Sequence, residues 1–265
     1  MGRLMHRVLP RRRAIAGINL RLCFPELDDA ARRNLRVRHF EALGMGVFET
    51  AMAWWTPDAK FKNLGRVEGG EHLERALQRG KGVILVGGHF TTLDLGGRLV
   101  AQRTPFHVMY REHQNPLLEW VLKRSRERVY ERAIPREDVR DMLRSLKHNK
   151  TIGYVPDQNF GHKYSVFTGF FGVPAATNTA ITRLAKASGA AVVPFFTRRV
   201  PHDGGWRYVI TLEPPLDGFP SGDLEQDALR INRLIEAQVR QAPEQYLWVH
   251  RRFKDRPPGE AALYP

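Results

Sequence analysis

Cysteine, long apolar runs and acidic side chains are all scarce in this sequence of 265 residues. The single Cys23 excludes an internal disulfide and a thiolate metal cluster, and it favours a reducing compartment. No run approaches the roughly 18 apolar residues that a membrane-spanning helix needs. A secretory signal is also missing, because the basic start of the chain is not followed by an apolar core. These absences predict a chain that is made and kept in the cytoplasm.

The shortage of acids leaves a strong positive charge. Against 42 Lys and Arg stand 28 Asp and Glu, so the formal net charge is +14. Such an excess predicts an anionic partner, which could be a nucleic acid, a phospholipid surface, a phosphorylated substrate or an acidic carrier protein. Charge alone does not choose among them. The length and the 42% hydrophobic content suit one domain over residues 1–265, with a basic segment at 1–18.

Strand and helix patterns alternate along most of the chain. We expect strands at 82–86, 106–110, 129–133, 151–155, 190–196 and 207–212, and helices at 25–55, 71–79, 135–147, 175–188 and 221–241, with one more opened by Asn115 and Pro116. This alternation predicts a single α/β domain with a mixed central sheet flanked by helices. Residues 160–171 follow no clean period, and they are typical either of a packed surface loop or of the apolar lip of a lipid groove.

One turn carries a histidine and an aspartate. A buried strand ends at Val86, and Thr92 begins a helix, so His89 falls in the turn between them. Positions five apart in one helix point about 140° apart, so His89 can meet Asp94 only from outside the helix. We expect Asp94, in the first helical turn, to accept a hydrogen bond from one ring nitrogen and leave the other free as a base.

The turn alone leaves two interpretations open. A histidine near a strand end is often a satisfied polar group, and a His-x4-Asp pattern also occurs by chance. Gly87 and Gly88 favour a site, because glycine lets a substrate approach the backbone closely.

Further blocks follow the pair in a fixed order. They are Gly87-Gly-His-Phe-Thr-Thr-Leu-Asp94, Tyr110-Arg-Glu-His-Gln-Asn-Pro-Leu117 with Trp120, Tyr154-Val-Pro-Asp157, and Ala242-Pro-Glu-Gln-Tyr-Leu-Trp-Val-His-Arg-Arg-Phe-Lys254. In these blocks, and from about Asn19 onward, the chain resembles the late acyltransferases of lipid A biosynthesis. These are the bacterial lauroyl and myristoyl transferases, which are related to the glycerol-phosphate acyltransferases through the His-x4-Asp/Glu motif.

The resemblance implies a glycerol-phosphate-acyltransferase-like fold and acyl transfer from acyl carrier protein. The acceptor would be the hydroxyl of a 3-hydroxyacyl chain on a phosphorylated, Kdo-bearing lipid A precursor. His89 would be the general base and Asp94 its partner. Arg126 would hold a phosphate or the oxyanion, and Asp157 would orient a base or a sugar hydroxyl; Arg111 is a further candidate for phosphate binding.

No cofactor or metal is needed for this chemistry. The remaining histidines have no ligand spacing around the motif, so we predict no zinc site; they include His107, His113, His148 and His162. Without the resemblance, Arg126 reads as part of a solvated helix face, and Asp157 as a turn residue at a strand end.

The resemblance also places the protein at the cytoplasmic face of the inner membrane. Family members usually carry an N-terminal anchor helix, which this sequence lacks, so binding to an anionic membrane surface would rest on basic and apolar side chains. Two alternatives remain. One is an acyltransferase for another glycolipid or a lysophospholipid. The other is a basic nucleic-acid-binding protein, suggested by the charge and by the aromatic and cationic segment Trp248–Lys254, although we expect no nucleic acid because no recognition motif is present.

Overall fold

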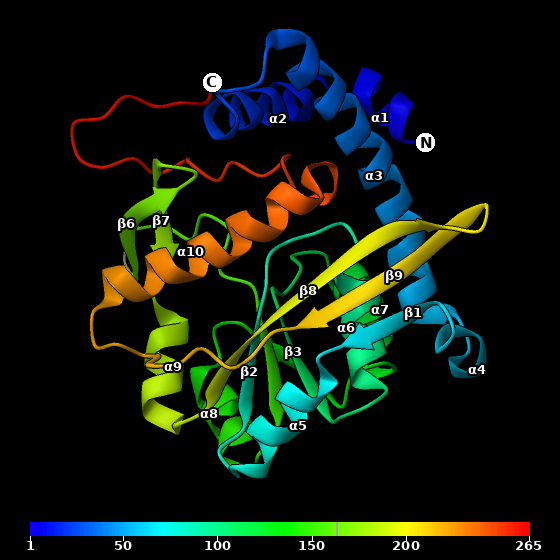
Figure 1. Cartoon of the computed structure of the whole chain (residues 1–265), viewed down its shortest axis with the longest axis vertical. Coiled ribbons are helices and arrows are strands. Elements are labelled where there is room, and N and C mark those ends of the chain that lie inside the picture. Colours follow the sequence, from blue (N-terminus) through cyan, green and yellow to red (C-terminus); the bar gives the residue numbers. More distant parts are fainter. Residues whose placement is uncertain (163) are drawn as a thin grey trace.

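The computed structural model describes residues 1–162 and 164–265 and, at 206, the backbone (Figure 1). The helices are α1 (Gly2–Val8), α2 (Pro10–Cys23), α3 (Asp29–Trp55), α4 (Asp58–Phe61), α5 (Gly70–Gln78), α6 (Leu93–Ala101), α7 (Pro116–Glu127), α8 (Val139–Lys147), α9 (Ala180–Ser188), α10 (Leu224–Gln241) and the 3-10 turn η1 (Pro243–Gln245). The strands are β1 (Gly65–Glu68), β2 (Val83–Val86), β3 (Phe106–Tyr110), β4 (Arg132–Pro135), β5 (Thr151–Tyr154), β6 (Ser165–Phe170), β7 (Val173–Asn178), β8 (Ala191–His202) and β9 (Gly205–Leu212).

Seven strands form one mixed sheet in the order β1-β9-β8-β2-β5-β3-β4. The five strands from β8 to β4 are parallel to one another, whereas β9 runs antiparallel to β8 and β1 runs parallel to β9. Strands β6 and β7 form a separate hairpin. The predicted fold class, a single α/β domain with a mixed sheet between helices, is confirmed.

Both faces of the sheet are covered. Side chains alternate along a strand, so Ile84 and Val86 of β2 pack toward α8, α9 and α10, while Val83 and Leu85 pack toward α5 and α6. All four side chains are buried. Burial on both sides explains why this strand reads as a continuous apolar run rather than an alternating one.

Most predicted elements are found, and the clearest error concerns residues 175–188. The alanine-rich start of this segment favours a helix, yet residues Val173–Asn178 form β7 and the helix begins only at Ala180. Pairing with β6 buries Ala175 and Ala176 completely, and this tertiary contact outweighs local propensity. The long helix α3 likewise begins at Asp29 rather than at Pro25, since Asp28 caps it by accepting from the Ala31 backbone N–H.

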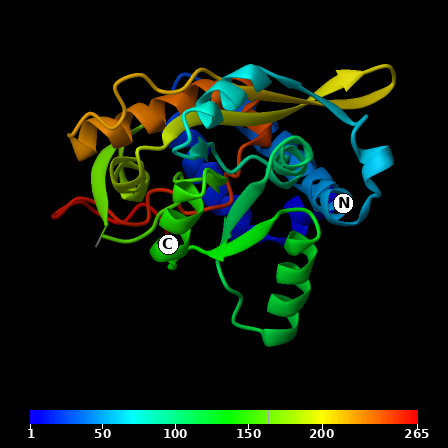
Figure 2. The ribbon, with the colours of Figure 1, turned by 90° about the horizontal axis from the view of Figure 1, so that it is seen from below.

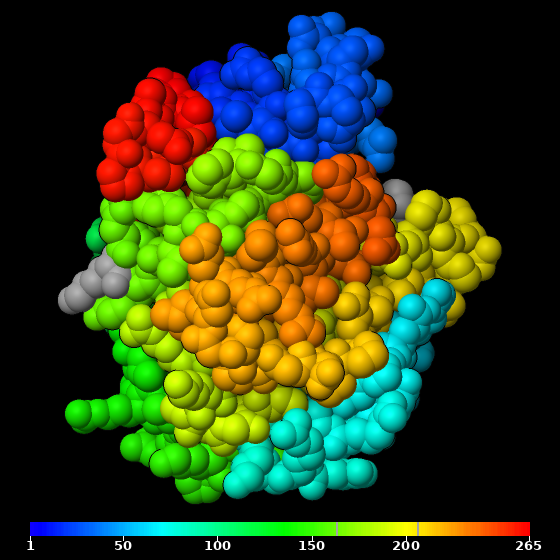
Figure 3. Space-filling model, turned by 60° about the vertical axis from the view of Figure 1, so that its left-hand side comes forward, coloured from blue at the N-terminus to red at the C-terminus, as the bar shows by residue number. Residues whose placement is uncertain are grey.

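The two ends of the chain lie together, as the blue and red surfaces of Figure 3 show. From α2, the side-chain amide of Asn19 donates to the backbone carbonyls of Trp248 and His250 at 2.7 and 2.8 Å. Tyr264 donates its hydroxyl to the Asn19 side-chain oxygen at 2.5 Å. The N-terminal helices therefore support the C-terminal segment. No helix in the described part of the chain is both long and apolar enough to cross a membrane.

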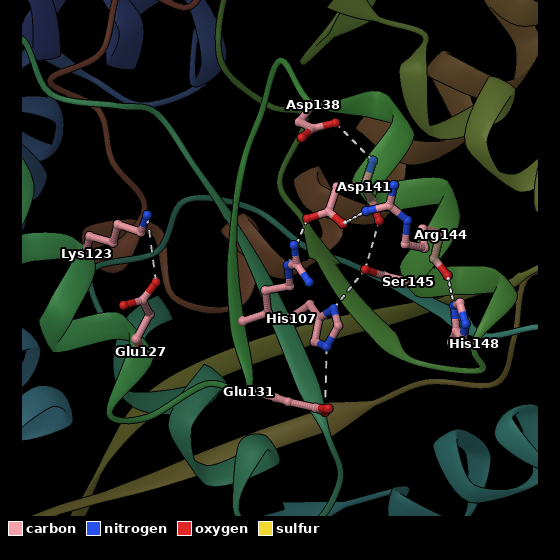
Figure 4. A network of polar contacts seen from close by, with 10 residues as sticks. His107, Lys123, Glu127, Glu131, Asp138, Asp141, Arg144, Ser145 and His148 are labelled. Carbon is pink, nitrogen blue, oxygen red and sulfur yellow. Dashed lines mark hydrogen bonds and ion pairs between the residues drawn. The ribbon is translucent and has the colours of Figure 1, made fainter.

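A polar network fixes α8 to the edge of the sheet (Figure 4). Buried Asp141 accepts from Arg132 at 2.8 Å and from Arg144 at 3.2 Å. The Ser145 hydroxyl donates to the Asp141 backbone carbonyl and lies 2.9 Å from Nδ1 of His107. His107 therefore has a structural role at the edge of the sheet.

Candidate active site

The parallel pairing of β2 with β5 brings His89 and Asp157 together. Val86 is the register partner of Tyr154, and each of the two site residues lies three positions beyond its strand end. Because the carboxyl ends of parallel strands share one edge of the sheet, the two loops leave it side by side. This edge is where open α/β sheets bind their ligands.

Asp157 grips His89 through both carboxylate oxygens. Its Oδ1 lies 2.5 Å from Nδ1 of the His89 ring, and its Oδ2 accepts from the His89 backbone N–H at 2.8 Å. Asp157 is 1% exposed, whereas the His89 side chain is 28% exposed. With the Nδ1 proton directed at Asp157, Nε2 is the nitrogen left to accept a proton.

The charges of this pair stabilise each other. Burial raises the pKa of Asp157, but the charge of His89, the two hydrogen bonds from His89 and that from the Tyr246 hydroxyl outweigh it and lower the pKa to about 2. Burial lowers the pKa of His89, but the charge and hydrogen bond of Asp157, with the charge of Asp94, raise it above its ordinary value. The site therefore favours an imidazolium beside a carboxylate.

The C-terminal segment holds the turn in place. The Leu247 backbone N–H donates to the His89 carbonyl at 2.9 Å, and Thr91 donates to the Gln245 carbonyl at 2.8 Å. Trp248 is buried, as is Arg252, which donates to Ala176 and Thr177. Of the two roles that the sequence left open for this segment, a structural one is observed.

The glycines before His89 serve packing rather than substrate approach. A side chain at Gly87 would lie 2.5 Å from the carbonyl oxygen of Phe195, and one at Gly88 would lie 2.9 Å from Ile235. Since Phe195 belongs to β8 and Ile235 to α10, both glycines let the turn sit tightly against the sheet and its covering helix.

Asp94 does not make the predicted bond. It lies in the first turn of α6, as expected, but no hydrogen bond or ion pair joins it to His89 among the described residues. Its Oδ2 accepts instead from the Thr50 hydroxyl of α3 at 3.1 Å. Burial raises the pKa of Asp94, a shift that Arg126, Thr50 and His89 partly offset. Asp157 has taken the ring nitrogen because it follows the neighbouring strand.

His89 and Asp94 line a cavity of about 340 Å³ together with the two predicted arginines, Arg111 and Arg126. The guanidinium of Arg126 stacks over Trp54 and Tyr110, and its Nη1 is buried without a hydrogen-bond partner. The remaining wall is largely apolar, and it includes Leu85, Phe106, Val108, Tyr130 and Phe195. All five predicted site residues thus gather around one turn.

A larger cavity of about 600 Å³ lies between α8 and α9 and shares Tyr154 with the first. Phe160 and Tyr164 line it, so this part of the irregular loop forms an apolar rim, whereas Phe170 is core; residue 163 lies outside the described residues. Within the described residues, no three His, Cys, Asp or Glu side chains are grouped to hold a metal ion.

Two contributors to the site were not predicted. Tyr246 reaches Asp157 from the C-terminal segment, and Thr50 reaches Asp94 from the middle of α3. Nothing in the local sequence indicates either contact. The role of Asp157, by contrast, could have been inferred by aligning the ends of the two predicted parallel strands.

The comparison with known families settles the class of the protein. A model of the bacterial lipid A biosynthesis acyltransferases matches residues 1–255. The chain belongs to this family. It is 40% identical over 265 residues to the lipid A biosynthesis lauroyltransferase of Escherichia coli, a match that covers all of this chain and 86% of that protein. The E. coli palmitoleoyltransferase gives the same identity and coverage, and the myristoyltransferase is 31% identical over 267 residues, which is 82% of its length.

The family membership makes the protein an acyltransferase of lipid A biosynthesis. The geometry suits this chemistry. A histidine with one nitrogen fixed and the other open can take a proton from an attacking hydroxyl, and a cavity with apolar walls can hold an acyl chain beside it.

Proposed function

We propose that this chain moves a fatty acyl group from the thioester of acyl carrier protein to the hydroxyl of a 3-hydroxyacyl chain on a Kdo-bearing, phosphorylated lipid A precursor. The observation that carries the proposal is the double hydrogen bond from Asp157 to His89 at the edge of the cavity. The printed names of the relatives support the acyl transfer and the lipid A precursor, and the resemblance adds the donor.

In the proposed reaction His89 Nε2 takes the proton of the acceptor hydroxyl as its oxygen attacks the thioester carbonyl. The C–O bond forms, the tetrahedral oxyanion collapses, and the C–S bond breaks. The imidazolium then returns its proton to the carrier thiolate, so the products are an ester and a free thiol. Asp157 keeps the ring in one tautomer and stabilises its charge throughout.

Arg126 is the proposed electrostatic partner of the substrate. Its buried Nη1 has no hydrogen-bond partner in the structure, and such a donor is available for the oxyanion or for a phosphate oxygen. Arg111, exposed at the end of β3, would contact a phosphate at the mouth of the cavity. Asp94 would stabilise the imidazolium from the other side by its charge alone.

The proposed location is the cytoplasmic face of the inner membrane, with peripheral attachment. Helix α7 projects from the body of the molecule (Figure 2). It exposes Leu117, Leu118 and Trp120, and α3 exposes Phe48 and Trp55. Large apolar side chains that are exposed among arginines are typical of a surface that binds an anionic membrane.

The test is transfer of a labelled acyl group from acyl carrier protein to a Kdo-bearing lipid A precursor in detergent micelles. We expect turnover by the wild type and a loss of about 10²- to 10⁴-fold in His89→Gln, since the general base is gone. His148→Gln, a substitution in the distant network of Figure 4, should leave turnover unchanged.

No transfer by folded wild-type protein to this acceptor would reject the proposal. Turnover with another glycolipid or a lysophospholipid would then identify the alternative acceptor. Equal activity in wild type and His89→Gln would keep the reaction but reject His89 as its base.

A further inference from the structure

The N-terminal region concentrates positive charge that the proposed reaction does not use. Residues 1–38 contain ten arginines and three carboxylates, a net charge of +7 and half of the +14 of the whole chain. Several of these arginines face one another where α2 packs on α3. They line a cleft of about 320 Å³, which we call the arginine cleft and which is bounded by Ala14, Gly17, Ile18, Leu20, Arg21, Asp29, Arg32, Arg33 and Arg36.

The acidic side chain of the cleft is already engaged. Asp29 accepts from Arg32 at 2.8 Å, and Arg32 also donates to the backbone carbonyls of Phe24 and Pro25. Among the described residues, no ion pair is formed by Arg21, Arg33 or Arg36. Three guanidinium groups therefore share a small space without a counter-charge.

Arg36 is held in a defined position rather than waving in solvent. Its Nη1 lies so close to α2 that a side-chain carbon at Gly17 would be only 3.0 Å away. Its Nε is buried and has no hydrogen-bond partner. Burial lowers the pKa of Arg36, and the charges of Arg13 and Arg33 lower it further. An unpaired, partly desolvated cation surrounded by like charges is unfavourable unless an anion joins it.

We propose that the arginine cleft binds the phosphate group of a membrane lipid. Guanidinium groups converging from two helices match the several oxygens of a phosphate, and each can donate two parallel hydrogen bonds. The neighbouring helix indicates a lipid as the source. Helix α1 packs on α3 beside the cleft, and Met1, Leu4 and Val8 on it are each at least 60% exposed. Cationic and apolar side chains at one end of the molecule suit a headgroup and the adjoining acyl region.

The inference does not depend on which acyl chain is transferred or on turnover at all, so binding is the measurement. We would follow binding of the full chain to phosphatidylcholine vesicles with and without phosphatidic acid, using wild type and Arg33→Gln/Arg36→Gln. The control is Arg66→Gln/Arg75→Gln, which removes the same charge from β1 and α5 at the far end of the molecule (Figure 1). We expect the cleft variant to lose about tenfold or more of its affinity for phosphatidic acid vesicles, and the control little.

A second variant separates a built site from a general positive surface. Gly17→Leu keeps every charge but fills the space of the Arg36 guanidinium, so it should also weaken vesicle binding. Inorganic phosphate should raise the melting temperature of the wild type but not of Arg33→Gln/Arg36→Gln, because a ligand stabilises only the state that binds it. A response to phosphatidic acid alone would show that the lipid, and not free phosphate, is recognised.

Equal losses in the cleft and control variants would overturn the proposal, because only total charge would then matter. So would cleft variants that bind vesicles normally but lose acyl carrier protein, which would make the cleft a protein-docking surface. Arg33 is exposed, so Arg33→Gln alone tests the same point if Arg36→Gln does not fold.

Discussion

The two sides of His89 differ in how they are built. On one side, Asp157 makes two hydrogen bonds to the same residue, and Tyr246 and the backbone of Leu247 support the turn. On the other side, Asp94 and Arg126 influence the site by charge, with no hydrogen bond or ion pair to His89 in the described part of the chain. Geometry is fixed by the first side, while the second shapes the field around the base.

The difference teaches which side the chemistry can change. A base must keep one tautomer through every turnover, and this is best secured by rigid groups from neighbouring strands. Substrate must enter from the remaining side, so the groups there line a cavity and keep free hydrogen-bonding capacity. Substitutions on the two sides should therefore have different kinetic signatures.

The largest effect should follow from Asp157→Asn. The amide cannot accept both hydrogen bonds from His89, and it favours the wrong ring tautomer, so we expect kcat to fall by about 10³- to 10⁴-fold. Asp141→Asn is the matched control, since it also neutralises a buried carboxylate that accepts two hydrogen bonds, but in the network of Figure 4. Turnover assays with melting curves should show a stability loss in the control with kcat retained. A comparable kcat loss in both variants would contradict the role of Asp157.

A smaller effect, about 10²-fold in kcat, is expected for Asp94→Asn, because charge stabilisation of the imidazolium is lost while the ring stays fixed. The pH profile gives the sign. His89 must be neutral to act as a base, so activity rises as pH increases through its pKa. Asp94 helps to raise that pKa, and its neutralisation should move the acidic limb of kcat/KM to lower pH. An unmoved limb would mean that Asp94 acts on something other than His89.

How much of this was predictable depends on sequence distance. The strand, turn and helix around His89, and the cap and proline that open α7, follow from local patterns and were predicted. The pairing of His89 with Asp157 spans 68 positions and depends on β2 and β5 being neighbours, which the local pattern does not state. The short distance to Asp94 in the sequence therefore suggested the wrong hydrogen-bond partner.

The same reasoning accounts for the missed hairpin and the missed site residues. Strand β7 is built from small residues whose pairing with β6 decides their conformation, and Tyr246 becomes part of the site through a bridge between Phe90 and itself. Such contacts arise from packing of distant segments, and local propensity carries no record of them. The predicted site residues nevertheless gather in one place, because strand ends collect on one edge of the sheet.

The smallest effect should come from Arg126→Gln, with about a tenfold loss in kcat/KM, as removal of one charge-assisted hydrogen bond predicts. Arg124→Gln is the control, because Arg124 is exposed on the same helix and stacks on Trp120 instead of facing the cavity. Arg126 also lowers the pKa of Asp94, so its loss should leave Asp94 more readily protonated. The deficit should then widen as pH falls, measured as the ratio of wild-type to variant kcat/KM. A constant ratio across pH would limit Arg126 to the substrate, and an equal loss in Arg124→Gln would remove it from the open side of the site altogether.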